Sequence, residues 1–387
     1  MYPALAVLRA VVEHEYTPVD LGDDESIVEG VTLSSSSLKQ FLWVGGIDGM
    51  EEKLVKRAGI PYEAIPAAGV HGVGLKALPG NLSKLGQGFI ASRRLLRRFR
   101  PDVLLFTGGY LAVPMALAGR VPVSGMSRPR SLLYVPDIEP GLALKTVARF
   151  ADQVAFTSEE SKEYFPHLSR TVVSGYPTRP GLRQWSMVDA RDALGLSADL
   201  PTLLVFGGSK GARSINRALL RILPQLLSDI QVVHISGQLD WPEVEDARRK
   251  LIDSLEHELA NRYRAYSYLH EEMGAALTAA DLALSRAGAS TLGEYPLFGL
   301  PAILVPYPFA WRYQQVNAQY LAQRGAALVV QDAELSDRIL ALVLDLFGKP
   351  HELEKMSVAM RSLANPNAAK NIADHLFKLA QVRGGEL

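Results

Sequence analysis

The chain has 387 residues, of which 48% are hydrophobic and 21% charged, a composition that is typical of a soluble globular protein and argues against extended disorder. At roughly 100–200 residues per domain, this length predicts two domains. Lysine and arginine together number 41, as do aspartate and glutamate, so the net charge gives no reason to expect nucleic-acid binding. There is no cysteine and the 8 histidines are scattered, which excludes disulfides and thiolate chemistry and predicts no metal site.

Apolar runs alternate with amphipathic stretches along the first half, which predicts βαβ units around a parallel sheet. The helical pattern covers Tyr2–His14 and Glu51–Ala58. Strands are expected at Gln40–Val44, which ends at Gly45-Gly46, and at Val103–Phe106, Ser131–Tyr134 and Gln153–Phe156. No apolar run reaches the about 20 residues of a membrane-spanning helix, so any membrane contact is expected to be peripheral.

Two segments interrupt this rhythm. Residues 16–38 hold an acidic cluster and four consecutive serines, and we interpret them as a surface insertion. The run Gly175–Gly181 combines two prolines with two glycines, which favours a linker. We therefore expect an α/β domain at 1–178, a second at 179–365 and a C-terminal helix at 366–387 that packs back on the first. Two doubly wound domains would face each other across a cleft at the carboxyl ends of their strands.

In the second half, strands are expected at Thr202–Phe206, Gln231–Ile235, Leu282–Ser285 and Ala302–Val305. The first runs into the turn Gly207–Arg213, which opens a helix. Glycine N–H groups, the helix amino end and the Ser209 hydroxyl can together hold an anion. A tight connection without a ligand is an equally good interpretation of this turn.

A second glycine turn, Ser285–Thr291, follows the strand at Leu282–Ser285. Amides near Gly288 and the hydroxyl of Thr291 can take phosphate oxygens, and Glu294 can accept both hydroxyls of a ribose. The alternative for Glu294 is an acid favoured by the helix dipole.

Three further segments carry candidate chemistry, each with a structural alternative. After the strand at Ala302–Val305, the amides of Gln314, Gln315 and Asn317 suit sugar hydroxyls or a solvated helix start. Gly108-Gly109-Tyr110 repeats the strand–glycine–helix arrangement in the first half. The arginine-rich stretch Ser92–Arg100 predicts either a helix on an anionic surface or a solvated face over buried leucines.

Taken in chain order, these segments resemble the MurG-type UDP-N-acetylglucosamine transferases of peptidoglycan synthesis, glycosyltransferase family 28. The similarity runs from Tyr2–Val7 to about Ala327. It is carried by Gly59-Ile60-Pro61, Gly108-Gly109-Tyr110, Gly207–Arg213, Ser285–Ala289 with Glu294, and Pro301–Pro306. The resemblance implies a GT-B fold of two Rossmann-like domains and an inverting transfer of N-acetylglucosamine from UDP-GlcNAc to a polyprenyl-pyrophosphate-linked sugar acceptor, lipid I to lipid II. It implies no cofactor and no metal.

The resemblance also implies a donor site, position by position. Backbone groups at Leu269 would meet the uracil, with Met273 nearby, and Glu294 would take the ribose hydroxyls. The remaining implied residues are Ser209, Gly288, Ala289, Ser290 and Thr291 for the diphosphate, Gln314 and Gln315 for the sugar, Arg179 near the nucleotide, and Gly108, Gly109 and Tyr110 on the acceptor side.

The acceptor half departs from the family pattern. The family has a strand and a glycine-rich loop ending in His before the stretch that matches Met1–Ala4, so we expect Met1 to be an internal methionine of a longer reading frame. Tyr134–Asp137 replaces the family's His-Glu-Gln-Asn, Tyr176-Pro177 replaces its Asn-Pro, and Phe309 replaces a His. An inverting transfer needs a base for the acceptor hydroxyl, and Asp137 is the candidate.

A polyprenyl-linked acceptor stays in the bilayer, so the resemblance implies a peripheral enzyme on the cytoplasmic face of the cell membrane. Contact with the anionic surface would involve Val70, Leu75, Lys76, Leu78, Lys84 and Arg93–Arg100. Two other functions stay open. They are a UDP-GlcNAc 2-epimerase-like enzyme, which would share the GT-B fold, and a non-catalytic paralogue that binds a UDP-sugar.

Overall fold

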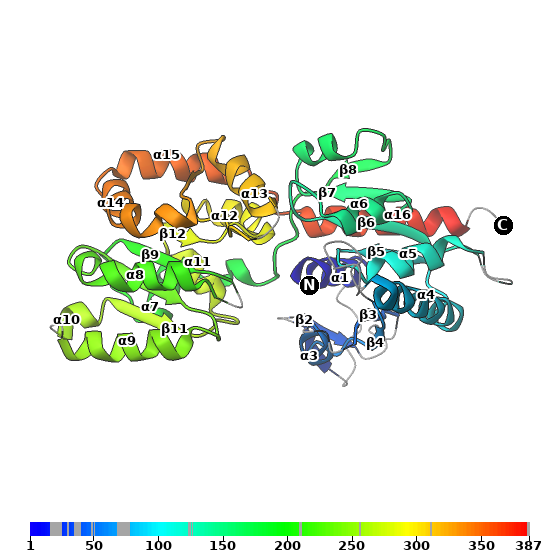
Figure 1. Ribbon diagram of the computed structural model, residues 1–387, viewed down its shortest axis with the longest axis horizontal. Coiled ribbons are helices and arrows are strands. Elements are labelled where there is room, and N and C mark those ends of the chain that lie inside the picture. Colours follow the sequence, from blue (N-terminus) through cyan, green and yellow to red (C-terminus); the bar gives the residue numbers. More distant parts are fainter. Residues whose placement is uncertain are drawn as a thin grey trace. The chain divides into compact units, whose positions relative to one another are not determined.

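The computed structural model describes residues 1–15, 25–28, 31–34, 40–47, 49, 51–67, 78–122, 125, 127–208, 211–254, 257–309 and 312–384. The chain divides into two compact units. Unit 1 consists of Met1–Pro180 and Pro366–Leu387, and unit 2 of Gly181–Asn365. Both are built from parallel strands with helices against them (Figure 1).

Unit 1 holds a four-stranded parallel sheet, β5-β6-β7-β8, a separate parallel pair, β3-β4, and an antiparallel pair, β1-β2. Its strands are β1 (Glu25–Val28), β2 (Val31–Ser34), β3 (Trp43–Gly46), β4 (Tyr62–Ile65), β5 (Val103–Phe106), β6 (Arg130–Val135), β7 (Gln153–Phe156) and β8 (Thr171–Val173). Its helices are α1 (Tyr2–Glu15), α3 (Glu52–Arg57), α4 (Leu78–Phe99), α5 (Ala112–Arg120), α6 (Leu142–Ala148), the 3-10 helix η1 (Glu159–Tyr164) and α16 (Ala368–Gly384).

Two expectations in this half need correction or restriction. The strand predicted at Gln40–Val44 covers Trp43–Gly46 instead, and its two glycines are part of the ladder. A Cβ at Gly45 would lie 2.1 Å from the Tyr62 hydroxyl oxygen, so a larger residue there would displace the Tyr62 ring. The predicted insertion at 16–38 lies mainly outside the described residues, and its described parts are β1 and β2.

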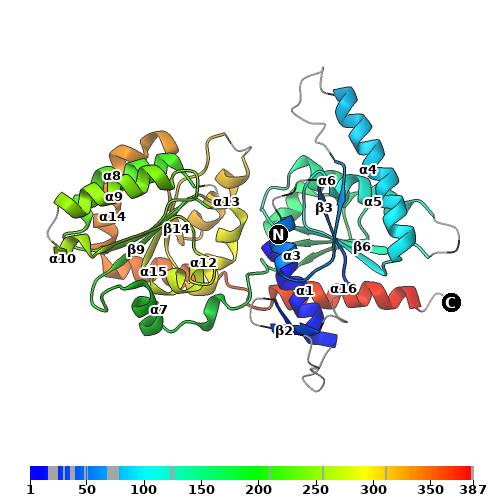
Figure 2. The ribbon, with the colours of Figure 1, turned by 90° about the horizontal axis from the view of Figure 1, so that it is seen from below.

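The last helix, α16, belongs to unit 1 although it follows unit 2 in the chain (Figure 2). It contacts α1, β5 and β6. Ile372 is fully buried, and the Asn371 side chain donates to the Ser174 carbonyl at 3.2 Å. Unit 1 is therefore assembled from both ends of the chain.

Unit 2 is a doubly wound parallel sheet with the strand order β11-β10-β9-β12-β13-β14. Its strands are β9 (Thr202–Phe206), β10 (Gln231–Ile235), β11 (Tyr263–Tyr266), β12 (Leu282–Ser285), β13 (Ala302–Leu304) and β14 (Ala327–Val329). Its helices are α7 (Met187–Leu194), α8 (Arg213–Leu226), α9 (Trp241–Ser254), α10 (His257–Ala260), α11 (Met273–Ala279), α12 (Glu294–Phe298), α13 (Tyr313–Ala322), α14 (Leu335–Phe347) and α15 (Pro350–Arg361), with 3-10 turns η2 (Leu182–Gln184), η3 (Ala289–Leu292) and η4 (Asp332–Glu334).

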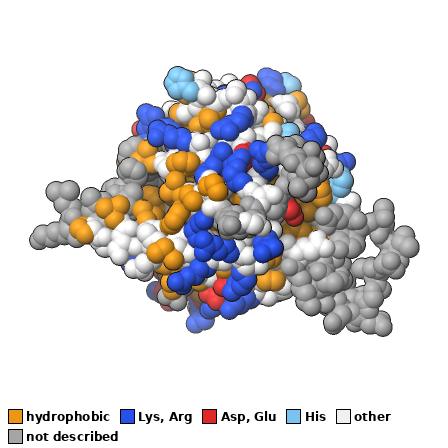
Figure 3. Space-filling model, turned by 90° about the vertical axis from the view of Figure 1, so that its right-hand side faces the viewer, with side chains coloured by type: hydrophobic (Ala, Val, Ile, Leu, Met, Phe, Trp, Pro, Cys, Tyr) orange, Lys and Arg blue, Asp and Glu red, His pale blue; other side chains and the backbone are white. Residues whose placement is uncertain are grey.

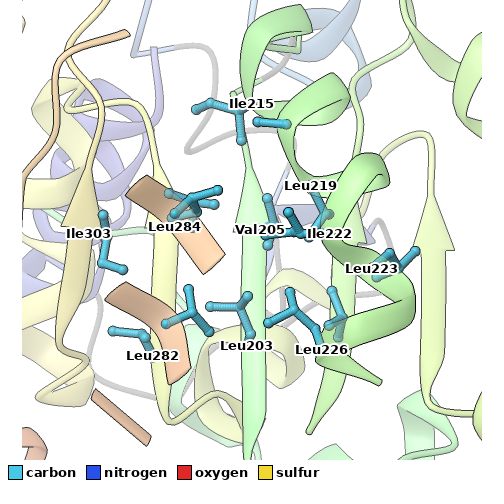
Figure 4. Packing of buried hydrophobic residues seen from close by; sticks show 14 of the residues in the cluster. Leu203, Val205, Ile215, Leu219, Ile222, Leu223, Leu226, Leu282, Leu284 and Ile303 are labelled. Carbon is cyan, nitrogen blue, oxygen red and sulfur yellow. The ribbon is translucent and has the colours of Figure 1, made fainter. Parts of the chain in front are cut away.

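The core of unit 2 fixes the position of α8 on the sheet. Apolar residues of α8 recur at the spacing of one helix face, and they pack on leucines and valines of β9 and β12 (Figure 4). The residues labelled there are all buried: Leu203, Val205, Ile215, Leu219, Ile222, Leu223, Leu226, Leu282, Leu284 and Ile303. The amino end of α8 is thereby held beside the carboxyl end of β9.

Candidate functional site

The strand order of unit 2 places the two glycine turns next to each other. The chain runs outward from β9 to β11, then returns to the other side of β9 and continues from β12 to β14. Phe206 and Ser285, the last residues of β9 and β12, are paired in the register. The turns that follow them therefore leave the sheet at its topological switch point, where open α/β sheets bind ligands.

The first turn leads into α8 without a side-chain cap. Gly208 and Gly211 have φ angles of 87° and 83°, and a Cβ at Gly211 would lie 2.2 Å from the Ser236 carbonyl oxygen. Only glycine satisfies both the conformation and the close contact. No side chain caps α8 at Ala212, so the helix presents N–H groups and its positive end to an anion. Ser209 lies outside the described residues.

The second turn begins at Gly288 and forms η3. A Cβ at Gly288 would meet nothing within 4 Å, so open space lies beside the backbone there. Ala289 and Ser290 are half-buried. Thr291 is buried, and its hydroxyl donates to the Gly288 carbonyl at 2.7 Å. Because its single proton is used in this bond, Thr291 can donate to a phosphate only if the bond breaks.

Glu294 is the first residue of α12 and is only 6% exposed. The neighbouring Tyr295 is fully buried, and its hydroxyl lies 2.5 Å from the Ser285 Oγ. Burial raises the pKa of Tyr295, and the charge of Glu294 adds to the rise. Tyr295 therefore stays neutral and ties α12 to the end of β12, which fixes the carboxylate beside the second turn.

An ion pair between Arg286 and Asp332 links the second turn to η4 and to the start of α8. Arg286 donates from Nη1 to the Val305 carbonyl at 3.1 Å and to Asp332 Oδ1 at 2.5 Å, and from Nη2 to the Ser214 Oγ at 2.8 Å. The Ser214 hydroxyl also donates to Asp332, at 2.7 Å. The sequence motif contained Arg286, but Asp332 follows β14, a strand that the sequence analysis did not predict. The network joins the β12 turn, α8 and η4 around one guanidinium.

The amides of α13 take different positions. Gln314 Oε1 accepts from the Tyr307 N–H at 2.9 Å, and Gln315 Oε1 lies 3.5 Å from the Gln331 Nε2. Asn317 is fully buried, and its Nδ2 lies 3.2 Å from the Ala287 carbonyl oxygen. The suggestion that Asn317 binds sugar hydroxyls is therefore wrong, because the structure uses this side chain to hold the second glycine turn.

Leu269 and Met273 follow β11 and are both 7% exposed. These residues share the carboxyl edge with the glycine turns, and in the sheet β11 is separated from β9 by β10 and from β12 by β10 and β9. Leu269 and Met273 therefore lie apart from the glycine turns along this edge, as the proposed separate positions for the uracil and the phosphates require.

In unit 1, the candidate acceptor residues follow neighbouring strands. Gly108 and Gly109 come after β5, with φ angles of 129° and 84°, and Tyr110 is 43% exposed. Asp137 comes after β6, which pairs in parallel with β5, and is half-buried. These four residues therefore lie at the same edge of the sheet.

A hydrogen bond and a cation–π contact involve two further tyrosines of unit 1. The Tyr134 hydroxyl lies 2.7 Å from the Thr157 Oγ1. Burial, and to a smaller extent Tyr176 and Asp137, raises the pKa of Tyr134, so this tyrosine stays protonated. Arg179, which belongs to unit 1, stacks its guanidinium 4.4 Å from the centre of the Tyr2 ring.

Two general features can be stated for the described part of the chain. It contains no group of three or more histidine, aspartate or glutamate side chains that could hold a metal ion. Nor does it contain a helix with the length and hydropathy needed to cross a bilayer.

Two Rossmann-like units, one with two glycine turns at its switch point, are the architecture of the GT-B class. The solved structure of MurG from Acinetobacter baumannii matches over 97% of this chain and 95% of its own, with a TM-score of 0.67 and 25% identity. A UDP-GlcNAc 2-epimerase from Neisseria meningitidis matches over 97% of both chains with a TM-score of 0.62 at 13% identity, which supports the fold alone.

Sequence comparison identifies the family within the GT-B class to which the chain belongs. The models of the glycosyltransferase family 28 N-terminal and C-terminal domains match residues 26–156 and 202–376. The UDP-N-acetylglucosamine–N-acetylmuramyl-(pentapeptide) pyrophosphoryl-undecaprenol N-acetylglucosamine transferase of Roseiflexus sp. (strain RS-1) is 39% identical, over 96% of this chain and 91% of its own. The chain belongs to glycosyltransferase family 28, and the predicted fold class and family are confirmed.

Proposed function

We propose that this glycosyltransferase transfers N-acetylglucosamine from UDP-GlcNAc to muramyl-pentapeptide pyrophosphoryl-undecaprenol, which is the conversion of lipid I to lipid II. The observation that carries the proposal is the switch point of unit 2. There, two glycine turns, the uncapped amino end of α8 and the guanidinium of Arg286 lie on neighbouring strands. This is an environment for a diphosphate, and the names of the relatives identify the reaction.

In this proposal the donor lies along the carboxyl edge of unit 2. The diphosphate takes the amino end of α8, with Ser209, and the turn Gly288–Thr291, where Arg286 stabilises the negative charge of the departing UDP. Glu294 accepts from the ribose hydroxyls, and the backbone at Leu269 meets the uracil beside Met273. Gln314 and Gln315 meet the sugar.

The acceptor reacts beside unit 1. Its hydroxyl gives its proton to Asp137 and attacks C1 of the sugar, while the bond from C1 to the diphosphate oxygen breaks and UDP leaves with the electron pair. Tyr134 stays protonated, so Asp137 is the group beside it that can act as base. Gly108, Gly109 and Tyr110 line the same edge on the acceptor side.

We also propose that unit 1 docks on the anionic, cytoplasmic face of the membrane. The face of unit 1 seen in Figure 3 carries basic and hydrophobic side chains side by side. Leu82 and Ile90 of α4 are 56% and 54% exposed. Arg94 and Arg97, which are also exposed, follow Ile90 by four and seven positions and so share its side of the helix. Val70, Leu75 and Lys76 lie outside the described residues.

The structure selects which arginines to test for membrane binding. Arg93 donates to the carbonyls of Ala118, Val121 and Pro122, so changing it would disturb the fold. Arg98 pairs with Glu63 at the surface, so it is already occupied by a carboxylate. Arg94→Glu with Arg97→Glu should weaken binding to anionic vesicles, because each cation contributes about 1 kcal/mol near such a surface. Equal binding of both proteins at low and high salt would contradict docking through α4.

Product analysis distinguishes the candidate functions. The purified chain is incubated with labelled UDP-GlcNAc, alone and with the lipid-linked acceptor in detergent. We expect labelled sugar on the lipid and equimolar UDP only when the acceptor is present. Formation of UDP-ManNAc without acceptor would favour an epimerase, and binding of UDP without turnover in either mixture would favour a non-catalytic protein.

A further inference from the structure

A network of hydrogen bonds between buried polar side chains lies behind the first glycine turn. His234 on β10 is fully buried, with its Nδ1 2.8 Å from the Tyr263 hydroxyl and its Nε2 2.9 Å from Asn216 Oδ1. Asn216 on α8 donates from Nδ2 to the Ser236 carbonyl at 2.9 Å and to Asp240 Oδ2 at 3.0 Å. These bonds connect β11, β10 and α8 inside the unit.

In each hydrogen bond of this network, only one assignment of donor and acceptor is possible. The partners of Asn216 Nδ2 are a carbonyl and a carboxylate, which only accept, so the Asn216 amide has one orientation. Its Oδ1 must then accept from the Nε2–H of His234, and the other ring nitrogen accepts from Tyr263. Burial lowers the pKa of His234 to about 3, so the imidazole remains neutral and in this single tautomer.

This hydrogen-bond network reaches the groups that shape the candidate phosphate site. Asp240 Oδ1 accepts from the Nε of Arg213, the first residue of α8, at 2.9 Å. The Ser236 carbonyl, which Asn216 holds, is the atom against which Gly211 packs. The network therefore fixes both the floor of the glycine turn and the start of the helix.

We propose that His234, Asn216 and Asp240 position the first glycine turn and the amino end of α8 to receive the diphosphate of the nucleotide sugar. They are positioning residues, because none of them lies at the open surface of the turn and each acts through Gly211 or Arg213. Apolar side chains could fill the same volume, but they would make no hydrogen bonds that orient the Ser236 carbonyl and the Arg213 side chain. The inference rests on the proposed function, since it assumes a diphosphate donor.

The test compares UDP with uridine. Asn216→Ala should weaken UDP binding about 3- to 30-fold in calorimetry and leave uridine binding unchanged, because uridine lacks the phosphates. His234→Gln, which keeps a polar side chain in the core, is the second variant should Asn216→Ala fail to fold. Gln231→Ala is the matched control. Gln231 is buried on the same strand, but at its other end, where it bonds with Ser197, Leu200 and Thr202.

The outcomes separate the two proposals. If the unchanged chain binds neither UDP nor uridine, the proposed function fails. The positioning role is overturned if UDP binding survives in a folded Asn216 or His234 variant, or if UDP and uridine weaken equally. It is also overturned if Gln231→Ala weakens UDP binding as much as Asn216→Ala does, because loss of any buried hydrogen bond would then suffice.

Discussion

The carboxyl edges of the two sheets use the same strand–glycine–helix arrangement but stabilise it with different chemistry. In unit 2, charged groups lie against the turns, where Arg286 bonds with Asp332 and Arg213 with Asp240. In unit 1, buried hydroxyls hold the corresponding edge, since Thr157 donates to the carbonyls of Val135 and Pro136. Unit 2 therefore fixes its turns with ion pairs, whereas unit 1 fixes the corresponding edge with hydroxyls.

A cluster of ion pairs in unit 1 lies at the opposite, amino edge of its sheet. Asp152 precedes β7 and contacts the guanidiniums of Arg128 at 2.6 Å, Arg120 at 3.7 Å and Arg130 at 3.8 Å. Although burial acts to raise the pKa of Asp152, hydrogen bonds from Arg128 and Ser131 lower it overall. The comparison teaches that ion pairs accompany the glycine turns at the edge of unit 2 that we propose for the diphosphate, whereas the Asp152 cluster of unit 1 lies away from its glycine turn.

The largest expected effect tests the structural side of this comparison. Asp152→Ala removes the carboxylate shared by three guanidiniums and should lower the free energy of unfolding by about 3–5 kcal/mol, measured by urea denaturation. UDP affinity of the folded protein should stay unchanged. Asp246→Ala is the control, since its pair with Lys250 is exposed and such pairs contribute about 0–1 kcal/mol. A loss of UDP affinity in folded Asp152→Ala would break the comparison.

The second prediction compares carboxylates at the two carboxyl edges. Glu294→Ala should weaken UDP binding by about 10- to 100-fold, because a hydrogen bond to a charged group contributes about 1.5–3 kcal/mol. Asp137→Ala should leave UDP binding unchanged and lower the rate of transfer. Calorimetry and product formation measure the two quantities. Unchanged UDP affinity in a folded Glu294→Ala protein would remove Glu294 from the donor site.

The third prediction concerns pH and the network behind the unit 2 edge. Between the unfolded pKa of His234 near 6.5 and its folded pKa of about 3, only the unfolded chain binds the proton, so stability is lost as pH falls through this window. At pH 5 the loss amounts to about 2 kcal/mol. The groups facing the imidazole, Asn216 and Tyr263, are neutral, because Asn216 does not ionise and burial raises the pKa of Tyr263.

Urea denaturation at pH 7 and pH 5 checks this value. His234→Gln removes the titrating group and leaves the other ionisable residues in place, so its stability should change less between the two pH values. An equal change in both proteins would show that His234 is protonated in the folded state or contributes nothing.

The sequence predicted the central strands better than the edge strands. The predicted Thr202–Phe206, Gln231–Ile235 and Leu282–Ser285 agree with β9, β10 and β12 residue for residue, because strands covered on both faces form continuous apolar runs. The sequence analysis missed β1 and β2, which lie in the expected insertion, although it predicted the edge strand β5 exactly. It also missed β4, β8, β11 and β14, which are all at sheet edges. They have three or four residues and are partly exposed, so no such run marks them.

In the candidate site, too, some features were predicted from the sequence and others were not. Glycines after apolar strands indicated both turns, because glycine marks the positions where backbone conformation is unusual. The partners of the turns could not be found from sequence. Asn216 and His234, or Arg286 and Asp332, are distant in the chain, and only the order of strands in the sheet brings them together.

The return of α16 to unit 1 has a consequence for the order in which the protein is made. Synthesis proceeds from the amino end, and domains generally fold as they emerge from the ribosome. Unit 2 is a continuous segment and is available as soon as Asn365 has emerged, whereas unit 1 lacks the cover of β5 and β6 until Ala368–Gly384 follows. The unit that is begun first is therefore completed last, and a nascent chain that stops at Asn365 carries a finished unit 2 and a unit 1 whose sheet is still uncovered.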